Sequence, residues 1–433
     1  MTTEAIHVMS AVKPTRARIF ILALVTVGTM INYLDRTVIS VAAPLLSKDL
    51  GLSAALMGVA FSAFSWTYAA AQIPGGVLLD RFGVRLTYYW SVTLWSVCTV
   101  LQGLSAGLGS LVGARLALGI AEAPAYPSNS RILSMWFPQA ERARATGVYS
   151  VGQYFGLAFL SPVLFWVAGS FGWRALFVIV GIIGVLFGLA WWFAYRDPHE
   201  SDRVNSQELA YIAEGGGLSG QSSVTRFEWR HIRFLLSKRQ ILGASIGQFA
   251  GNSTLVFFLT WFPTYLATER QMAWLKVGIF AVLPFIAASV GVVVGGVVSD
   301  YLLRRTGSAN IARKLPIISG LVLASTIVSA NFLKSDALVI AVMSLAFFGQ
   351  GMVNLGWTLI TDVAPKQLIG LTGGVFNLCA NLAGIVTPLV VGFVVATTGS
   401  FEWALGFIAV VALIGALSYI FVLGDVKRVE YEA

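Results

Sequence analysis

The stretch GVLLDRFGVR, residues 76–85, decides how this chain folds. It places three charged residues between an apolar run at 54–79 and another at 86–107. A membrane-spanning helix needs about 20 predominantly apolar residues, and each run has roughly that length. A related signal, Gly296-x-x-x-Asp300, ends the apolar run at 274–301. The chain is therefore expected to cross a membrane repeatedly, as helices joined by charged loops.

The composition of the 433 residues supports this interpretation. Hydrophobic residues make up 57% and charged residues 11%, whereas a soluble protein carries about 25% charged residues. A soluble fold of this composition would expose large apolar areas, so an ordinary soluble enzyme, a disordered chain and a secreted disulfide scaffold are excluded. Strands of an outer-membrane barrel alternate apolar and polar residues over about 10 positions, unlike these runs. Cys98 and Cys379 lie within apolar runs and are expected to be buried free thiols.

Twelve apolar runs predict an all-α membrane protein with twelve transmembrane helices. The polar stretch 196–238 contains three consecutive glycines and separates six runs from six. We therefore expect an N-terminal segment (1–18), two six-helix bundles (19–195 and 239–424), a central loop (196–238) and a tail (425–433). The predicted spans are 19–46, 54–79, 86–107, 110–133, 143–168, 173–195, 239–266, 274–301, 312–333, 335–361, 367–397 and 402–424.

The distribution of basic residues predicts the orientation. With these spans, and with residues at span ends counted with the adjoining loops, 22 of the 29 Lys and Arg lie on the side of the termini and the central loop, five lie on the other side, and Arg36 and Arg115 lie deeper within spans. Lys and Arg concentrate on cytoplasmic loops. Both termini and the central loop, including its basic segment Arg226 to Arg239, are therefore predicted to be cytoplasmic. The net charge of +9 is explained by this topology rather than by a nucleic-acid partner.

The two bundles are related by an internal repeat. Pro138 precedes Gly147 by nine residues, as Pro365 precedes Gly374, and each glycine opens a similar string, GVYS or GVFN. Parallel repeats of six spans are typical of secondary transporters, in which the substrate binds between the halves near mid-membrane.

The stretch 76–85 resembles the loop 2–3 signature of the major facilitator superfamily, so the resemblance implies the major facilitator fold. The glycine of this signature allows close helix approach, and its Asp can pair with an Arg or cap a neighbouring helix as a latch. The second copy, at 300–305, lacks the Arg that follows the Asp. The gating motif comprises Gly76, Asp80, Arg81, Gly83 and Arg85.

A narrower resemblance lies in INYLDR (31–36), FSWTY (64–68), QIPGG (72–76), EAPAYP (122–127) and LTGGVFN (371–377). These segments are similar to the anion:cation symporter family, and most similar to bacterial galactonate, glucarate and hexuronate transporters. The resemblance covers about residues 20 to 424. It implies a carrier of the bacterial inner membrane that imports organic anions, chiefly sugar acids, with protons by alternating access.

Four charged residues within the spans require an explanation: Asp35, Arg36, Arg115 and Glu122. A charge at mid-bilayer costs about 2.5–3.5 kcal/mol on insertion scales, so it must face a cavity or a partner. Arg36 is predicted to hold a substrate carboxylate, because a guanidinium stays charged and binds carboxylates bidentately. Asp35 and Glu122 can titrate, and the resemblance assigns proton coupling to them. Arg115 is expected to be a charge partner of Glu122 or to extend toward the cytoplasmic surface; a static ion-pair network is the alternative for all four.

Polar side chains within the spans form a candidate lining, because amides and phenols can bond the hydroxyl groups of a sugar acid. The alternative is that they join helices to one another. By resemblance, five match binding positions of the family: Tyr33, Tyr68, Gln153, Trp357 and Asn377. The other candidates are Gln72, Gln248, Asn252 and Asn381.

Other functions remain open at this point. A tartrate or phthalate importer and, less favoured, a proton-driven drug exporter share the architecture. An intramembrane enzyme is not expected, because the spans contain no catalytic His/Asp/Ser constellation and no set of metal ligands. We expect a monomer with no cofactor other than the coupled protons.

Overall fold

A computed structural model describes residues 14–217 and 229–431 of the chain. Lys13 and Arg226, which contribute to the predicted charge distribution, lie outside the described residues. Helices account for nearly all of the described structure. In chain order they are α2 (Ala17–Leu50), α3 (Ala54–Gly103), α4 (Leu108–Glu122), α5 (Ala125–Trp136), α6 (Gln139–Ala194), η1 (Pro198–Glu200), α7 (Ser206–Glu214), α8 (Trp229–Ser237), α9 (Arg239–Thr260), α10 (Phe262–Thr264), η2 (Tyr265–Glu269), α11 (Trp274–Phe280), α12 (Val282–Thr306), α13 (Ala309–Ser325), η3 (Thr326–Phe332), α14 (Asp336–Val353), α15 (Gly356–Val363), η4 (Lys366–Leu368), α16 (Ile369–Thr398), α17 (Glu402–Leu417) and η5 (Ser418–Val422).

Twelve membrane spans follow from these helices. Nine helical segments of the described chain are long and apolar enough to span a membrane. Two of the longest, α3 and α6, each contain a sharp bend at a glycine with positive φ, Gly83 (φ 76°) and Gly172 (φ 84°), a conformation that other residues rarely adopt. Each bend reverses the chain, so α3 and α6 provide two spans apiece. The second arm of α3, the second arm of α6, and α4 with α5 complete the twelve.

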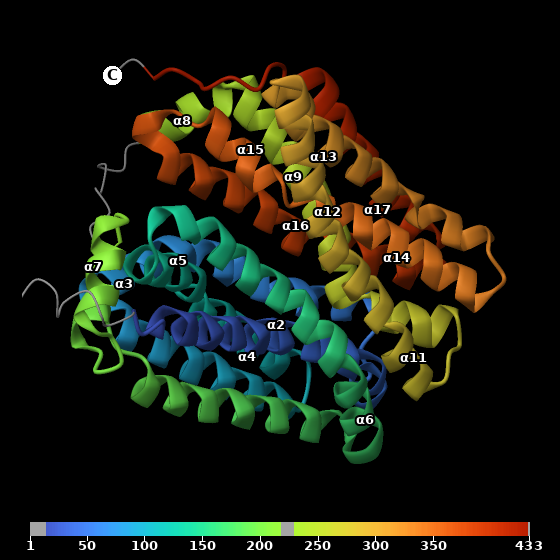
Figure 1. Ribbon diagram of the computed structural model, residues 1–433. Coiled ribbons are helices and arrows are strands. Elements are labelled where there is room, and N and C mark those ends of the chain that lie inside the picture. Colours follow the sequence, from blue (N-terminus) through green and yellow to red (C-terminus); the bar gives the residue numbers. More distant parts are fainter. Residues whose placement is uncertain (1–13, 218–228, 432–433) are drawn as a thin grey trace, which may run out of the picture.

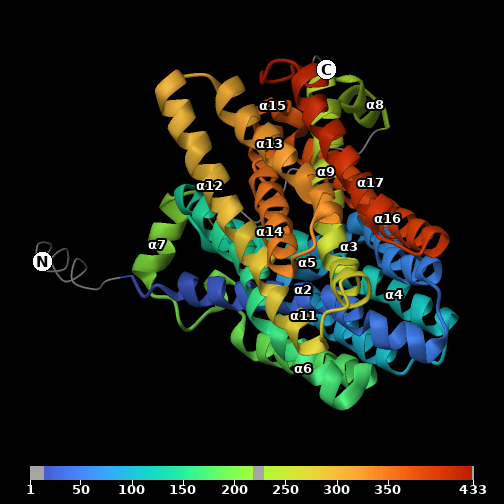
Figure 2. The same cartoon turned by 90° about the vertical axis from the view of Figure 1, so that its right-hand side faces the viewer.

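The spans form two bundles of six (Figure 1). The N-terminal bundle contains α2 to α6 and the C-terminal bundle α9 to η5. The bundles converge where α11 lies against α6, and spread toward the end that carries α7, α8 and both ends of the described chain. We call that end the terminus side, and the other the opposite side. Figure 2, turned toward the opposite side, shows α11 and α12 reaching onto the N-terminal bundle. The predicted all-α fold with two six-helix bundles is confirmed.

The hydrophobic core is shared by the bundles only on the opposite side. There, one cluster of buried residues includes Phe61 and Tyr154 from one bundle and Trp261 and Phe347 from the other. On the terminus side, each bundle has its own cluster. Hydrogen bonds follow the same division, since Trp274 Nε1 donates to the carbonyl of Phe165 on the opposite side, at 2.9 Å. The bundles are therefore packed together at one end of the molecule only.

The space around glycines also differs between the two sides of the molecule. On the opposite side, a Cβ built on Gly58 would collide with the backbone of Pro388 and Gly392 in the other bundle. On the terminus side, a Cβ on Gly76 or Gly147 would meet no atom of the described chain within 4 Å. The expected close helix approach at Gly76 is therefore absent from this conformation, because the bundles are separated there.

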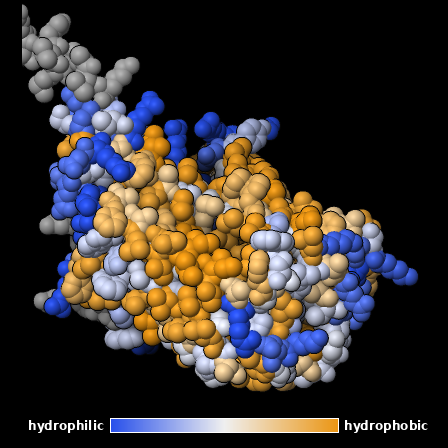
Figure 3. Space-filling view, turned by 90° about the horizontal axis from the view of Figure 1, so that it is seen from below, coloured by the Kyte–Doolittle hydropathy of each residue, from blue (hydrophilic) through white to orange (hydrophobic). Residues whose placement is uncertain are grey.

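The outer surface of the bundles is apolar. Figure 3 shows hydrophobic side chains over most of the visible face, with polar residues gathered toward its two ends. Large side chains exposed on α6 include Phe159, Trp166 and Phe193. Such a surface is compatible with a lipid environment rather than with water. Both cysteines are free thiols; Cys98 is buried as expected, whereas Cys379 is partly exposed.

Candidate functional site

The charged centre of the candidate site joins α2 to the end of α4. The Arg36 guanidinium forms an ion pair with Glu122, with Nε and Nη2 both directed at Oε1. Glu122 is the last residue of α4, and the span is interrupted there by Pro124, which lacks an amide hydrogen to continue the helical hydrogen bonds. The Glu122 side chain is fully buried, whereas 15% of the Arg36 side chain is exposed. Arg36 is therefore the member of the pair that an incoming anion can reach.

Three aromatic rings surround the Arg36 guanidinium. Its central carbon lies 5.2 Å from the ring centroid of Tyr33, 4.9 Å from that of Phe64 and 4.7 Å from that of Tyr68. A guanidinium in this position is attracted by the ring quadrupoles, and the attraction grows when water is excluded. The predicted residues Tyr33 and Tyr68 thus lie together at Arg36. Phe64 was not predicted, because an isolated Phe in an apolar helix has no distinguishing sequence signal.

A hydrogen-bonded chain extends from these rings to α6. The hydroxyl of Tyr126, on α5, lies 3.2 Å from that of Tyr33 and 3.0 Å from Oε1 of Gln153. The structure thereby connects two predicted residues through Tyr126, which was not predicted as a site residue. Its place in the EAPAYP segment, which also carries Glu122, was a usable signal. Gln72, one turn beyond Tyr68, has a buried amide nitrogen without a hydrogen-bond partner among the described residues.

Asp35 points away from Arg36. The two residues are consecutive on α2, so their side chains diverge by about 100° around the helix. Asp35 is fully buried against the second arm of α3, beside Trp95 and Thr99. Neither carboxylate oxygen has a hydrogen-bond partner within the part of the chain that the structure describes. Glu122, and not Asp35, is therefore the acid that holds Arg36 in this conformation.

Arg115 differs from both predicted alternatives. Its guanidinium donates to the backbone carbonyls of Ala60 (3.2 Å) and Phe61 (3.0 Å) on α3, and lies 5.2 Å from the ring centroid of Phe64. It makes no ion pair with Glu122 in the described structure, because the two side chains are two helical turns apart and do not bend toward each other. It also does not extend to a membrane surface, since only 2% of the residue is exposed. Backbone carbonyls are partners that a sequence pattern does not reveal.

The predicted residues of the C-terminal bundle separate into two groups. Three make contacts within that bundle. Asn252 joins two helices, as the alternative expected, whereas the Asn381 amide bonds within its own helix and Oε1 of Gln248 has no hydrogen-bond partner among the described residues. Asn252 Nδ2 donates to the carbonyl of Ala380 at 2.7 Å, Asn381 Nδ2 donates to the carbonyl of Asn377 at 2.9 Å, and Gln248 packs against Gly356.

Trp357 and Asn377 form the second group. Trp357 is 41% exposed and packs edge-on against Phe376, with ring centroids 5.0 Å apart. Asn377, the next residue along α16, is partly exposed and its side chain makes no hydrogen bond to the described residues. Both side chains are thus free to contact a bound molecule on the terminus-side half of the C-terminal bundle.

Tyr154 connects the bundles beside Gln153. Its ring packs edge-on against Phe347, with centroids 6.1 Å apart. Its buried hydroxyl lies beside the side chains of Gln350 and Asn354, where α14 gives way to α15. None of these three polar residues was predicted, because each lies within an apolar run without a repeated pattern. They mark the level at which the polar cluster meets the shared hydrophobic core.

The gating motif forms a latch within the N-terminal bundle. Asp80 accepts a hydrogen bond from Arg131 of α5 at 2.8 Å, and Arg85 donates to the carbonyl of Trp192 at 2.9 Å. Arg81 is exposed beside the ring of Phe82, at 5.4 Å.

In the C-terminal bundle, a different residue provides the corresponding connection. Arg313 donates to Asp362 at 2.9 Å and to Ser299 at 2.8 Å. The incomplete second copy of the motif is thus replaced by a latch whose Arg comes from α13.

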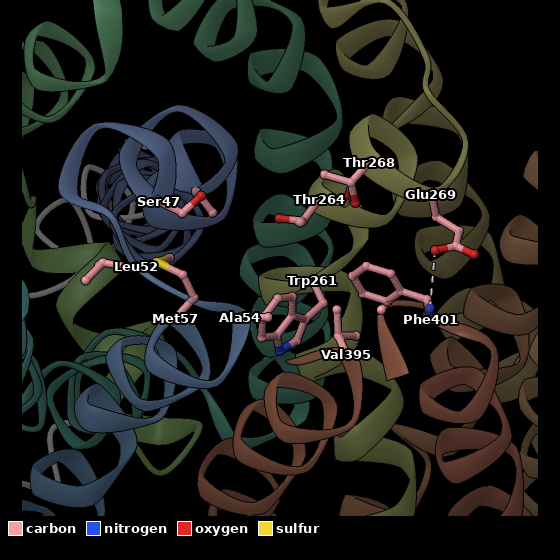
Figure 4. A pocket seen from close by; sticks show the side chains of 12 residues that line it. Ser47, Leu52, Ala54, Met57, Trp261, Thr264, Thr268, Glu269, Val395 and Phe401 are labelled. Atoms are coloured by element: carbon pink, nitrogen blue, oxygen red, sulfur yellow. Dashed lines mark hydrogen bonds between the residues drawn. The ribbon is translucent and has the colours of Figure 1, made fainter. Parts of the chain in front are cut away.

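A pocket of about 270 Å³ lies between the bundles on the opposite side. Figure 4 shows Ser47 and Met57 on one wall and Thr264, Thr268 and Glu269 on the other. Trp261, which also lines the pocket, packs edge-on against Phe61 of the other bundle, with centroids 5.0 Å apart. None of the predicted site residues lines this pocket. Trp261 and Phe61 both belong to the hydrophobic cluster that the two bundles share on this side.

Comparison with known proteins agrees with this architecture. Residues 25–388 match the Major Facilitator Superfamily. The chain is 42% identical to the probable galactarate/D-glucarate transporter GudP of Escherichia coli (strain K12), over 97% of this chain and 96% of the relative. It is 44% identical to the D-galactonate transporter of Escherichia coli O6:H1, over 97% and 99% of the respective chains.

Solved structures support the fold. A bacterial homologue of the human lysosomal transporter Spinster, in an inward-facing and occupied conformation, is 20% identical over 94% of this chain and 96% of that chain, with a TM-score of 0.70. A D-xylose–proton symporter is 14% identical over 95% and 99%, with a TM-score of 0.72. The chain is a membrane transporter and belongs to the major facilitator superfamily.

Proposed function

We propose that this transporter imports sugar acids, of the hexonate or aldarate class, together with protons. The observation that supports this most directly is the partly exposed Arg36, held by a single buried acid and surrounded by phenols. A guanidinium is the side chain best suited to a carboxylate, and phenols and amides can bond hydroxyl groups. The names of the relatives, galactarate/D-glucarate and D-galactonate transporters, point to the same substrates.

The Arg36–Glu122 pair suggests how anion and proton are coupled. Glu122 and the substrate carboxylate compete for the same guanidinium. When Glu122 takes up a proton, it loses the charge that holds Arg36, and Arg36 becomes free for the anion. Binding of the anion therefore favours protonation of Glu122, so that the anion and the proton are carried together. Coupling to more than one proton lets an anion enter against an inside-negative potential, which opposes it by about 2.3 kcal/mol per charge per 100 mV.

We further propose that the terminus side is cytoplasmic, because it carries most of the Lys and Arg. The membrane would then be the bacterial inner membrane, and the working unit a monomer. With this orientation the structure is the inward-open state, since the bundles share a core only on the opposite, periplasmic side. The cycle would close the cytoplasmic ends of the bundles and open the periplasmic ends.

Reconstituted protein tests the function. Proteoliposomes with an inwardly directed proton gradient are expected to accumulate labelled galactonate or glucarate, and a proton uncoupler is expected to abolish accumulation. Competition by tartrate, phthalate and sulfoacetate separates the alternatives, since one relative, 33% identical, is named a probable sulfoacetate transporter. Accumulation of one of these acids, without any for sugar acids, would overturn the proposed substrate class. Drug resistance in cells without sugar-acid uptake would favour an exporter instead.

A further inference from the structure

The surface helix α8 carries apolar and basic side chains together on its exposed side. Trp229, Arg233 and Leu236 follow one another at intervals of four and three residues, so they lie on one side of the helix. We call these three residues the outer face of α8. Trp229 is 76% exposed and Leu236 is 40% exposed, with the exposed Arg233 between them. A helix that combines large apolar residues with arginine in this way is typical of a membrane surface rather than of bulk water.

The inner face of α8 is fixed to the C-terminal bundle. Leu235 is fully buried and His231 is only 6% exposed. The Phe234 ring packs edge-on against Tyr431 near the end of the described chain, with ring centroids 4.9 Å apart, and the helix packs against α9 and α16. Because α8 is held in this orientation, its outer face is directed away from the protein.

The position of α8 along the chain places it at the boundary of the membrane. It ends at Ser237, and α9, which is long and apolar enough to span a membrane, begins two residues later at Arg239. Leu242, in the first turn of α9, is already 40% exposed, and Phe421 of the neighbouring η5 is 76% exposed. These side chains mark the level at which contact with acyl chains begins. Figure 2 shows α8 at the edge of the C-terminal bundle, and we therefore place it in the headgroup region.

The charge of this surface distinguishes one class of lipid from another. The segment 229–239 contains no acid and four basic residues, Arg230, Arg233, Lys238 and Arg239. The adjoining tail, residues 425–431, carries two acids and two bases, so it does not cancel this positive charge. Basic clusters beside a membrane span attract anionic lipids. A zwitterionic lipid carries a positive group beside its phosphate and is attracted less.

We propose that the outer face of α8 binds an anionic phospholipid of the leaflet on the terminus side. Arg233, together with Arg230 one turn earlier, binds the headgroup phosphate, because a guanidinium presents paired donors to phosphate oxygens. Trp229 and Leu236 contact the lipid where the headgroup meets the acyl chains, the level at which tryptophan is enriched in membrane proteins. This lipid site is independent of which anion the carrier transports.

Quenching of a fluorophore by spin-labelled lipids tests this site. The fluorophore is attached to Leu236→Cys in the full-length protein with Cys98→Ser and Cys379→Ser, in phosphatidylcholine nanodiscs. Spin-labelled phosphatidylglycerol is expected to quench about threefold more strongly than spin-labelled phosphatidylcholine at the same fraction, because basic residues attract the anionic lipid. The further substitutions Arg230→Gln and Arg233→Gln, both at exposed positions, are expected to bring the two lipids to equal quenching. Free glycerol phosphate is expected to leave the preference unchanged.

The matched reporter is Ala210→Cys on α7, the surface helix of the N-terminal bundle, which is exposed at this residue and contains no basic residue. It is expected to show no preference for phosphatidylglycerol. Equal quenching of the α8 reporter by both lipids, or a preference that survives without the two arginines, overturns the proposed site. Absence of quenching by either lipid overturns it as well, because α8 would then face water. Loss of the preference in glycerol phosphate would show a site for soluble phosphates instead.

Discussion

Arg36 of α2 and Glu122 at the end of α4 form an ion pair in which only the arginine is partly exposed. The Glu122 carboxylate is sealed inside the N-terminal bundle, whereas part of the Arg36 side chain is exposed. An anion that displaces Glu122 therefore leaves a carboxylate in a buried position, where ionisation is costly unless a proton is taken up. Anion binding and protonation are connected by this geometry.

Replacement of Arg36 is expected to abolish sugar-acid binding. Arg36→Ala also leaves the Glu122 charge buried and unpaired, which costs about 3–5 kcal/mol of stability. The double variant Arg36→Ala/Glu122→Gln removes both charges and is expected to recover stability without recovering binding. Calorimetry with galactonate and thermal unfolding of both variants separate the two effects. Wild-type affinity in the stable double variant would contradict the assignment of Arg36.

Glu122→Gln is expected to separate transport from the proton gradient. The glutamine resembles a permanently protonated acid, so Arg36 stays available and anion exchange continues, while accumulation driven by a pH gradient is lost. Counterflow of labelled substrate and gradient-driven uptake in proteoliposomes measure the two activities. Full gradient-driven accumulation would show that another group carries the coupled proton.

Asn377→Ala is expected to weaken sugar-acid binding by about 1–3 kcal/mol, the cost of leaving a substrate hydroxyl without its partner. Asn252→Ala is the matched control, because its amide already donates to the Ala380 carbonyl within the bundle. The control is expected to lower thermal stability and to leave affinity nearly unchanged. Equal losses of affinity in the two variants would make Asn377 a packing residue.

Gly147→Leu is expected to hold the carrier in the observed conformation. A side chain at Gly147 meets no described atom within 4 Å here, but it would obstruct closure of the terminus side. Substrate binding should persist while transport falls by at least tenfold. Gly406→Leu, at a glycine of α17 that also has open space around it, provides the control. Wild-type transport by Gly147→Leu would show that α6 does not approach the other bundle at this point.

Trp261→Ala is expected to loosen the opposite side, because it removes the ring that packs against Phe61. Thr264, on the wall of the pocket in Figure 4, can report this as Thr264→Cys in a background of Cys98→Ser and Cys379→Ser. A membrane-impermeant maleimide should label the cysteine faster after the tryptophan is removed. Trp166→Ala, at a ring exposed on the outer surface, should not change labelling. Equal labelling rates in the Thr264→Cys protein with and without either tryptophan substitution would show that Trp261 does not close the opposite side.

Glu208→Gln is expected to destabilise the N-terminal bundle. Burial opposes ionisation of Glu208, but hydrogen bonds from Thr15, the amide of Ala17 and Arg18 outweigh it and lower the pKa of the carboxyl. Because the pKa is lower in the folded state, the stabilisation is complete above the usual pKa of a glutamate. It is lost as the pH falls through the folded-state value. Thermal unfolding between pH 7 and 4 should show a difference from wild type that shrinks toward acid; Glu200→Gln is the control. A melting temperature of Glu208→Gln equal to that of wild type at pH 7 would contradict this stabilisation.

The sequence predicted the spans and the charged centre because membrane energetics leave few alternatives. Apolar runs must be helices, and a charge such as Arg36 must face protein or water. The choice of partner was not predictable. Consecutive residues such as Asp35 and Arg36 diverge around a helix, but which one faces the space between the bundles depends on tertiary packing. Arg115 bonds to backbone carbonyls, which every residue has and no side-chain pattern identifies.

The position of α7 has a consequence for how the polypeptide can be divided. Glu208 binds the first turn of α2 across 191 residues of sequence, so α7 belongs structurally to the N-terminal bundle. Meanwhile α8 packs on α9 of the C-terminal bundle. A gene split within codons 218–228 would therefore give two fragments that each retain their own surface helix, and their co-expression should reassemble a carrier. A split before codon 206 would remove Glu208 from the first fragment, and the first turn of α2 would lose the carboxylate to which it donates.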